Sequence, residues 1–351
     1  MSWLEFEDDD ETEFDESSVR VRPNPKANRP RTKRRPAHSD AHIARVLGVD
    51  RGRYTVLVDE DGPDERHVLA TRARELRKQP IVTGDRARVV GDVSGAEGTL
   101  ARIVGIEERT SLLRRSADDT DQVERIIVAN ADQMLIVVAA ADPEPRPRLV
   151  DRYLIAALDA GIRPFLVVTK TDLADPAEFL RHFEGVDDLR VFTSGQGRMP
   201  VAEIGAHLVG HSTVFVGHSG VGKSTLVNAL VPTAARATGH VNEVTGRGRH
   251  TSSSTVSLRY TSPEGTEHAG GRGWVIDTPG VRSFGLGHVD PANILKAFTD
   301  LAAVAEECPR GCTHLPDAPD CAIIGAVADG RLGERGPARL DSLQRLLATF
   351  A

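Results

Sequence analysis

Between residues 41 and 110, short apolar runs alternate with polar turns, which is the pattern of small β-strands. Apolar positions tend to alternate with period two, and the pair Asp61-Gly62 is typical of a hairpin turn. Five such short strands predict a small β-barrel of the OB or SH3 type. The runs that we expect to form these strands are 43–47, 54–58, 67–70, 86–90 and 98–104.

From about Gln122 the pattern changes, and longer apolar runs alternate with amphipathic stretches up to about Asp290. Such alternation predicts an α/β fold with a parallel sheet covered on both faces. The expected strands are 134–139, 165–168, 189–192, 213–216, 256–260 and 274–276, and the expected helices are 149–160 and 223–230. The rest of the chain is helical in pattern. We therefore predict a multi-domain chain with a tail over 1–40, an OB-like barrel over 41–110, a central α/β domain over 111–288 and a helical domain over 289–351.

Charge is unevenly distributed along the 351 residues. The net charge of −7 argues weakly against a nucleic-acid partner, but it averages two opposite blocks. Residues 1–18 contain nine acidic side chains and no basic one, and residues 19–36 contain eight basic side chains and no acidic one. We expect a disordered tail here, which is either simply solvated or a basic arm that contacts phosphates.

The sequence excludes a transmembrane protein and a secreted disulfide scaffold. The longest apolar run, Met134–Ala141, is far shorter than the ~20 residues that cross a bilayer, and the acidic start does not resemble a signal peptide. We therefore expect no membrane partner, no secretion signal and a cytoplasmic location.

Arginines in the barrel region favour RNA as a binding partner of the barrel, although a purely structural barrel remains an alternative. They are Arg72, Arg74, Arg77, Arg86 and Arg88.

The segment 217–224 fits the phosphate-loop pattern G-x-x-x-x-G-K-[ST] and lies between an expected strand and an expected helix. Backbone N–H groups and the helix N-terminus would surround phosphate oxygens. Lys223 would reach the β- and γ-phosphates, and Ser224 would hold Mg²⁺. The residues expected to contact the nucleotide here are Gly217, His218, Ser219, Gly220, Val221, Gly222, Lys223, Ser224 and Thr225.

Two further motifs follow apolar strands. In the first, DTPG at 277–280, Asp277 can hold Mg²⁺ through water and the Gly280 N–H can meet the γ-phosphate. In the second, TKTD, the carboxylate of Asp172 can accept two hydrogen bonds from guanine that adenine cannot offer. Lys170 can pack along the base, and a helix N-cap is the alternative interpretation of this segment. Its residues are Thr169, Lys170, Thr171 and Asp172.

The order of these motifs is unusual. The base-reading segment comes first, the phosphate loop second and DTPG third, whereas standard small GTPases place the base-reading motif last. This is the order of a circular permutation, which keeps the sheet and its loops and moves only the chain ends.

All three cysteines lie in one short segment, Cys308-x3-Cys312-x-His314-x6-Cys321. Three thiolates and one imidazole form a closed tetrahedral Zn²⁺ site, which is structural because no coordination position is open. The alternative is three unrelated thiols. The expected flanking helices, about 291–306 and 337–350, are too short to form a core without such a clamp.

The motifs GHSGVGKST, GRGRHTSS and DTPGVRSF and the Cys/His cluster resemble those of the circularly permuted ribosome-assembly GTPases of the RsgA family, also called YjeQ or EngC. The resemblance covers about residues 41–345. It implies hydrolysis of GTP to GDP in late maturation of the 30S subunit, 16S rRNA as a partner, Mg²⁺ with GTP and one structural Zn²⁺. It also implies a base contact at Ser194. One departure is Thr169, where the family usually has an asparagine that braces the phosphate loop and touches the base.

The group that orients the hydrolytic water is not evident. In many GTPases a glutamine follows DxxG, but here that position is the apolar Val281. The segment 246–251 resembles the family's switch, which makes Thr251 a candidate Mg²⁺ ligand. His250 is a candidate to polarise water, because imidazole titrates near neutral pH. A surface histidine in a mobile loop is the alternative, and we expect a low basal rate that the 30S subunit stimulates.

Three classes of function compete. A P-loop ATPase or kinase is disfavoured by Asp172 and by the DTPG segment. An RNA-binding module with a weak nucleotide site is disfavoured by the intact Lys223, Ser224 and Asp277. We therefore predict a GTPase, with Lys223 and the switch residues as its candidate catalytic groups, and nothing in the sequence demands more than a monomer.

Overall fold

The computed structural model describes residues 38–76, 79–115, 125–186, 188–234, 254–279, 286 and 289–350. The charged blocks at the start, and with them His250, Thr251 and Gly280, lie outside this set. The description below concerns the compact unit of residues 40–351. Among the residues described, no helix is both long and apolar enough to cross a bilayer.

The predicted barrel is present and closed. Its strands pair in the order β1-β2-β3-β5-β4, and β4 pairs back with β1. The β3–β5 pair is parallel and the other pairs are antiparallel. Alternate side chains point inward, and Val46, Val56 and Ile103 are completely buried there. The strands are His42–Asp50 (β1), Arg53–Val58 (β2), Arg66–Arg72 (β3), Arg86–Gly91 (β4) and Ala101–Ile106 (β5), with a 3-10 turn, η2, at Arg74–Leu76.

The α/β part has a sheet in the order β10-β9-β8-β11-β13-β12. Five of these strands are parallel, and the edge strand β12 runs antiparallel to β13. Apolar runs alone predict a buried strand without its direction, so the reversal of β12 was not expected. The strands are Gln133–Ala139 (β8), Arg163–Thr169 (β9), Arg190–Thr193 (β10), Ser212–Gly217 (β11), Val256–Thr261 (β12) and Arg272–Asp277 (β13).

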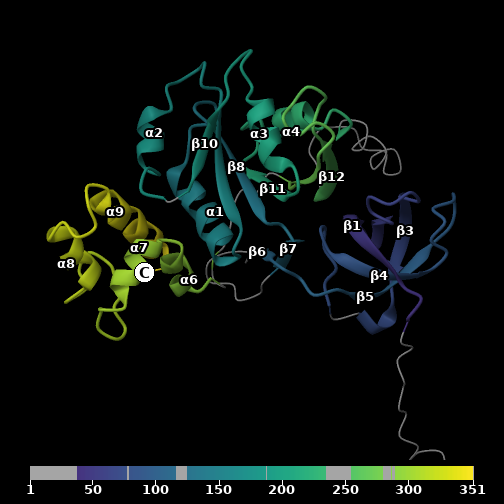
Figure 1. The fold of residues 1–351 in the computed structure, drawn as a ribbon, viewed down its shortest axis with the longest axis horizontal. Coiled ribbons are helices and arrows are strands. Elements are labelled where there is room, and N and C mark those ends of the chain that lie inside the picture. Colours follow the sequence, from purple (N-terminus) through teal and green to yellow (C-terminus); the bar gives the residue numbers. More distant parts are fainter. Residues whose placement is uncertain are drawn as a thin grey trace, which may run out of the picture. The chain divides into compact units, whose positions relative to one another are not determined.

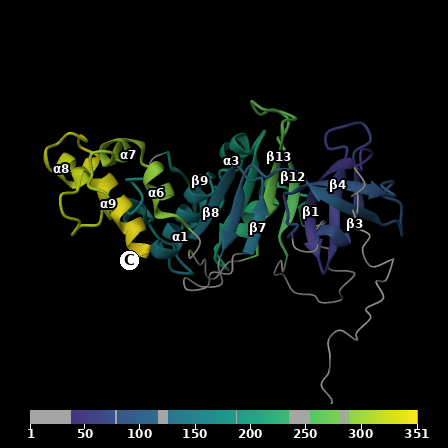
Figure 2. The same cartoon turned by 90° about the horizontal axis from the view of Figure 1, so that it is seen from below.

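Helices cover both faces of this sheet, as predicted (Figures 1 and 2). Side chains of α1 and α2 join the core on one face, and those of α3 and α4 join the core on the other. A two-stranded pair, β6 with β7, was not expected from the sequence. These elements are Pro147–Asp159 (α1), Ala177–Arg181 (α2), Val201–Leu208 (α3), Lys223–Leu230 (α4), Leu112–Arg115 (β6) and Arg125–Ala129 (β7).

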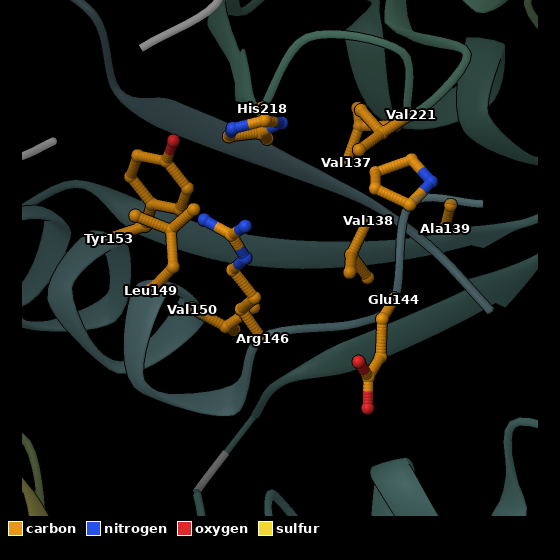
Figure 3. Close-up of a pocket in the computed structure, with 11 residues that line it drawn as sticks. Val137, Val138, Ala139, Glu144, Arg146, Leu149, Val150, Tyr153, His218 and Val221 are labelled. Carbon is orange, nitrogen blue, oxygen red and sulfur yellow. The ribbon is translucent and has the colours of Figure 1, made fainter. Parts of the chain in front are cut away.

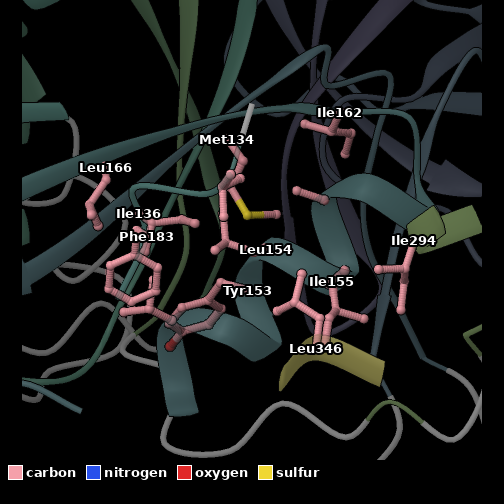
Figure 4. Packing of buried hydrophobic residues seen from close by; sticks show 14 of the residues in the cluster. Met134, Ile136, Tyr153, Leu154, Ile155, Ile162, Leu166, Phe183, Ile294 and Leu346 are labelled. Carbon is pink, nitrogen blue, oxygen red and sulfur yellow. The ribbon is translucent and has the colours of Figure 1, made fainter. Parts of the chain in front are cut away.

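The C-terminal helices pack against α1. Ile294 and Leu346 are completely buried beside Leu154 and Ile155 of α1, in one continuous core (Figure 4). These helices therefore share a core with α1, and the predicted metal ligand Cys321 is buried in this core, with Cys308 and Cys312 packed against it. The helices are Pro291–Lys296 (α6), Thr299–Ala305 (α7), Ala322–Ala328 (α8) and Gly336–Leu347 (α9), followed by a 3-10 turn, η3, at Ala348–Phe350.

The barrel contacts the α/β sheet through Trp274 of β13, which is 6% exposed. The guanidinium of Arg45 lies 4.9 Å from the indole centroid and that of Arg259 lies 4.4 Å from it. The indole N–H donates to Glu60 at 2.8 Å. Strand β13 thus contacts the barrel through Trp274 and ends at Asp277 of the DTPG motif.

Candidate active site

The phosphate loop connects β11 to α4, and its glycines are required by the local backbone. Gly220 and Gly222 have φ angles of +85° and +89°, a region that favours glycine. A Cβ on Gly217 would lie 2.5 Å from the carbonyl oxygen of Val137, so only glycine fits beside β8 there. The three glycines of the motif therefore serve the close turn from strand to helix that phosphate binding needs.

Lys223 and Asp277, which the sequence places in different motifs, meet in the structure. The ammonium of Lys223 pairs with the carboxylate of Asp277 and lies 2.5 Å from the carbonyl oxygen of Thr278. Both charged side chains are buried, at 7% and 4% exposure. Ser224 and Thr225 lie exposed in the first turn of α4. The two charges predicted for phosphate and metal binding thus lie together at the carboxyl ends of neighbouring parallel strands.

The base motif at the end of β9 packs against the loop that contains Ser194. The N–H of Ser194 donates to Val168 at 2.8 Å, and the carbonyl of Ser194 accepts from the N–H of Thr171 at 3.1 Å. Ser194 is buried, whereas Asp172 is exposed. One carboxylate oxygen of Asp172 accepts from the N–H of Gln196 at 3.0 Å. The two loops predicted to contact the base therefore lie side by side.

The N-cap interpretation of Asp172 does not hold, because α2 begins at Ala177 with Pro176 at the cap position. The N–H of Ala177 is instead bonded to Asp175, at 3.0 Å.

Lys170 has a backbone contact that the sequence could not indicate. Its φ angle is +55°, and its ammonium donates to the carbonyl oxygen of Asp142, in the loop between β8 and α1. A carbonyl is present at every residue, so no sequence pattern singles out Asp142. The hydrogen bond from the backbone N–H of Gln196 to Asp172 is hidden in the sequence for a similar reason, because every residue except proline has a backbone N–H.

A small pocket separates the phosphate loop from α1 (Figure 3). His218 and Val221 line it from the loop, and Leu149, Val150 and Tyr153 line it from α1. Burial raises the pKa of Tyr153, so its hydroxyl stays neutral. His218, predicted to contact the nucleotide, therefore also faces a pocket beside the loop, which Arg146 and Glu144 line together with apolar side chains.

The four residues of the Cys/His cluster come together. Their ligand atoms all lie within 4.8 Å of one another, and the Nδ1 atom of His314 is 3.7 Å from the Sγ atoms of Cys308 and Cys321. Tetrahedral Zn²⁺ with ordinary bond lengths separates a nitrogen from a sulfur ligand by about 3.6 Å. Burial lowers the pKa of His314, which favours the neutral imidazole that binds metal. The donor set, which includes Cys312, fits structural zinc.

The chain is similar in sequence to proteins of one known family. The family model described as RsgA GTPase matches residues 106–287. The "Small ribosomal subunit biogenesis GTPase RsgA 1" of Vibrio vulnificus is 36% identical over 280 residues, which cover 78% of this chain and 75% of that protein. The chain belongs to the RsgA GTPase family. A second member is the "Small ribosomal subunit biogenesis GTPase RsgA" of Pseudomonas aeruginosa. It is 36% identical to this chain over 281 residues, which cover 77% of this chain and 76% of the Pseudomonas protein.

Solved structures agree with this membership. YloQ, described as a circularly permuted GTPase, has a TM-score of 0.60 and 25% identity, with 90% of this chain and 97% of YloQ covered. YjeQ from Thermotoga maritima shares the fold with a TM-score of 0.59. The permuted GTPase architecture predicted from motif order is confirmed, and the chain is a GTP-hydrolysing enzyme. The alternatives of a P-loop ATPase or kinase and of a binding module without catalysis are set aside.

Proposed function

We propose that this chain hydrolyses GTP to GDP and phosphate during late maturation of the 30S small ribosomal subunit, and that the subunit stimulates it. The names of the Vibrio and Pseudomonas relatives support the ribosomal role. The observation that carries the catalytic assignment is the ion pair between Lys223 and Asp277. This pair lies at the carboxyl ends of the parallel strands, and the base motif lies at the same edge of the sheet, at the end of β9. In this proposal 16S rRNA is a direct partner, and the enzyme acts as a cytoplasmic monomer.

The proposed roles follow the positions of the side chains. Lys223 would release Asp277 and bind the β- and γ-phosphates, while Ser224, Asp277 and Thr251 would hold Mg²⁺, which neutralises phosphate charge. Gly280 would meet the γ-phosphate, and His250 would orient water. The cluster around His314 would hold one structural Zn²⁺.

Stimulation of GTP hydrolysis by purified 30S subunits tests the proposal, with wild type compared against His250→Ala and Lys223→Ala. We expect strong stimulation of wild type, intact GTP binding but little stimulation in H250A, and loss of both binding and turnover in K223A. Intact GTP binding with a rate that 30S subunits do not change would contradict the ribosomal role. Normal GTP turnover in K223A would contradict the assignment of Lys223 to the phosphate-binding site.

A further inference from the structure

The β8–α1 loop, residues 140–146, lies against the phosphate loop and is held there at two points. The ammonium of Lys170, from the base motif, donates to the carbonyl oxygen of Asp142 near the start of the β8–α1 loop. The ring of Pro143 lies beside Gly220 of the phosphate loop, where a Cβ on the glycine would be 3.8 Å from the proline Cδ atom. The β8–α1 loop is therefore fixed beside residues that are predicted to surround the phosphates.

Arg146 is the last residue of the β8–α1 loop and the N-cap residue of α1. Its carbonyl oxygen accepts from the N–H of Leu149 at 3.0 Å, which fixes its backbone to the helix. Its side chain is exposed and makes no cap hydrogen bond. Within the described part of the chain, its guanidinium has neither an ion pair nor a hydrogen bond. A fixed backbone therefore presents a cation whose five N–H donors are available to a ligand.

The guanidinium of Arg146 is directed toward the phosphate loop. Figure 3 shows it extending toward His218, across the pocket that both residues line, whereas the carboxylate of Glu144 points away from His218. The two lysines of the site already have partners, since Lys223 is in an ion pair and Lys170 is bonded to a backbone carbonyl. Of these three cations beside the phosphate loop, Arg146 is the one whose charge is not used within the described residues.

We propose that Arg146 is a catalytic residue that contacts the γ-phosphate of GTP in the transition state of hydrolysis. In this step the oxygen of water bonds to the γ-phosphorus, and the bond from this phosphorus to the bridging oxygen breaks. GDP keeps the electron pair of that bond, and the proton of the water goes to the released phosphate. Negative charge on the phosphate oxygens is stabilised by a guanidinium, whose planar N–H donors match their geometry. The role differs from that of His250, which would orient the water, and it rests on the proposed hydrolysis of GTP in this site.

Single-turnover hydrolysis of GTP by Arg146→Ala, with and without 30S subunits, tests the proposal. We expect the rate constant to fall about 100-fold in R146A, the usual loss when one donor to transition-state charge is removed. The affinities for GTP and GDP should stay as in wild type, because the contact forms only in the transition state. Binding of GDP with aluminium fluoride, which mimics the transferred phosphoryl group, should weaken in R146A. Arg146→Lys keeps the charge without the planar donors and should recover only part of the rate.

Arg148→Ala is the matched control. Arg148 is exposed on the same helix but does not line the pocket beside the phosphate loop. Its loss should therefore change the rate by about twofold at most. Because Arg146 makes no cap hydrogen bond, R146A should unfold at the temperature of wild type.

A hydrolysis rate in R146A equal to that of wild type would overturn the inference, as would an equal loss of rate in R148A. A loss of GDP affinity as large as the loss of rate would also overturn it, because the contact would then exist before the reaction. If R146A fails only to bind 30S subunits, measured with a GTP analogue that is not hydrolysed, Arg146 contacts the subunit and the inference is wrong. Lys223→Ala separates the two levels of the proposal, since rapid hydrolysis in K223A contradicts the phosphate-binding site itself. Slow hydrolysis in K223A together with wild-type hydrolysis in R146A contradicts only the role of Arg146.

Discussion

At the scale of single residues, base selection should depend on Asp172. Guanine offers its ring N–H and its exocyclic amine to a carboxylate, so Asp172→Asn replaces one acceptor with a donor. We expect GTP affinity to fall about 100-fold, since hydrogen bonds to charged groups contribute about 1.5–3 kcal/mol each. Xanthosine triphosphate, which has a carbonyl in place of the amine, should gain affinity.

Direct titration of wild type and of D172N with GTP and with xanthosine triphosphate measures this change. The hydrogen bond from Gln196 can persist in the variant, because asparagine keeps a carbonyl oxygen for it. The loop should therefore keep its shape, and unfolding temperature serves as the control. An unchanged preference for GTP would remove Asp172 from the base site.

At the scale of elements, α1 lines the pocket beside the phosphate loop and also packs against the C-terminal helices. Its Asp151 is buried, and Arg345 of α9 donates to it at 3.2 Å. Burial raises the pKa of Asp151 despite this partner. At the other end of α1, Asn293 donates to Asp159 at 2.9 Å. The C-terminal helices are thus bonded to both ends of α1.

Removal of the guanidinium should destabilise this packing. In Arg345→Met the buried carboxylate of Asp151 loses its partner, and we expect the free energy of unfolding to fall by about 3 kcal/mol. The folded-state pKa of Asp151, already above the ordinary value of 3.8, should rise further. The folded state then binds more protons than the unfolded state above pH 3.8, so stability falls as pH rises through the folded pKa.

Urea unfolding at pH 5 and pH 8 measures this effect. The deficit of R345M relative to wild type should be larger at pH 8 than at pH 5. The double variant Asp151→Asn/Arg345→Met carries no carboxylate at this position, so its deficit should not change with pH. A pH-independent deficit in R345M itself would contradict the assignment.

The Cys/His cluster and the core on α1 should respond differently to metal removal. If the cluster holds Zn²⁺, a chelator should increase hydrogen exchange over about residues 308–321, where all four ligands lie. Helix α9 should stay protected, because Leu343 and Leu346 are completely buried in the shared core. Exchange that a chelator does not change would argue against a metal in the cluster. Equal loss of protection in α9 would mean that the core on α1 depends on the metal, as the short lengths of the C-terminal helices predict.

At the scale of the whole molecule, the net charge of −7 conceals a segment suited to RNA. The eight basic side chains between residues 19 and 36 should contact phosphates if the ribosomal role holds. Replacing them with glutamine should weaken binding to 30S subunits and reduce the slope of log affinity against log salt, while basal GTP hydrolysis stays unchanged. Replacing the nine acidic side chains before them should have the opposite effect on affinity. An unchanged salt slope in the basic-block variant would show that the block is only a solvated tail.

Much of the fold follows from local patterns. The predicted helix over 223–230 coincides with α4, and the predicted strand over 134–139 lies within β8, since phosphate-loop chemistry and a long apolar run are both local signals. The direction of β12 was not predictable, because a buried strand has the same apolar pattern in either direction. The β6–β7 pair was missed for a related reason, since strand pairing depends on a partner elsewhere in the chain.

The sequence by itself determined which chemical groups this protein has and in which order, and that order identified a permuted GTPase. Only the tertiary structure decided that Lys223 meets Asp277 and that the hydroxyl of Thr169 is bonded to Val221. It also decided that the C-terminal helices share a core with α1. These contacts join residues far apart in the chain, and they depend on strand order and packing, which the local periodicity of a sequence does not encode.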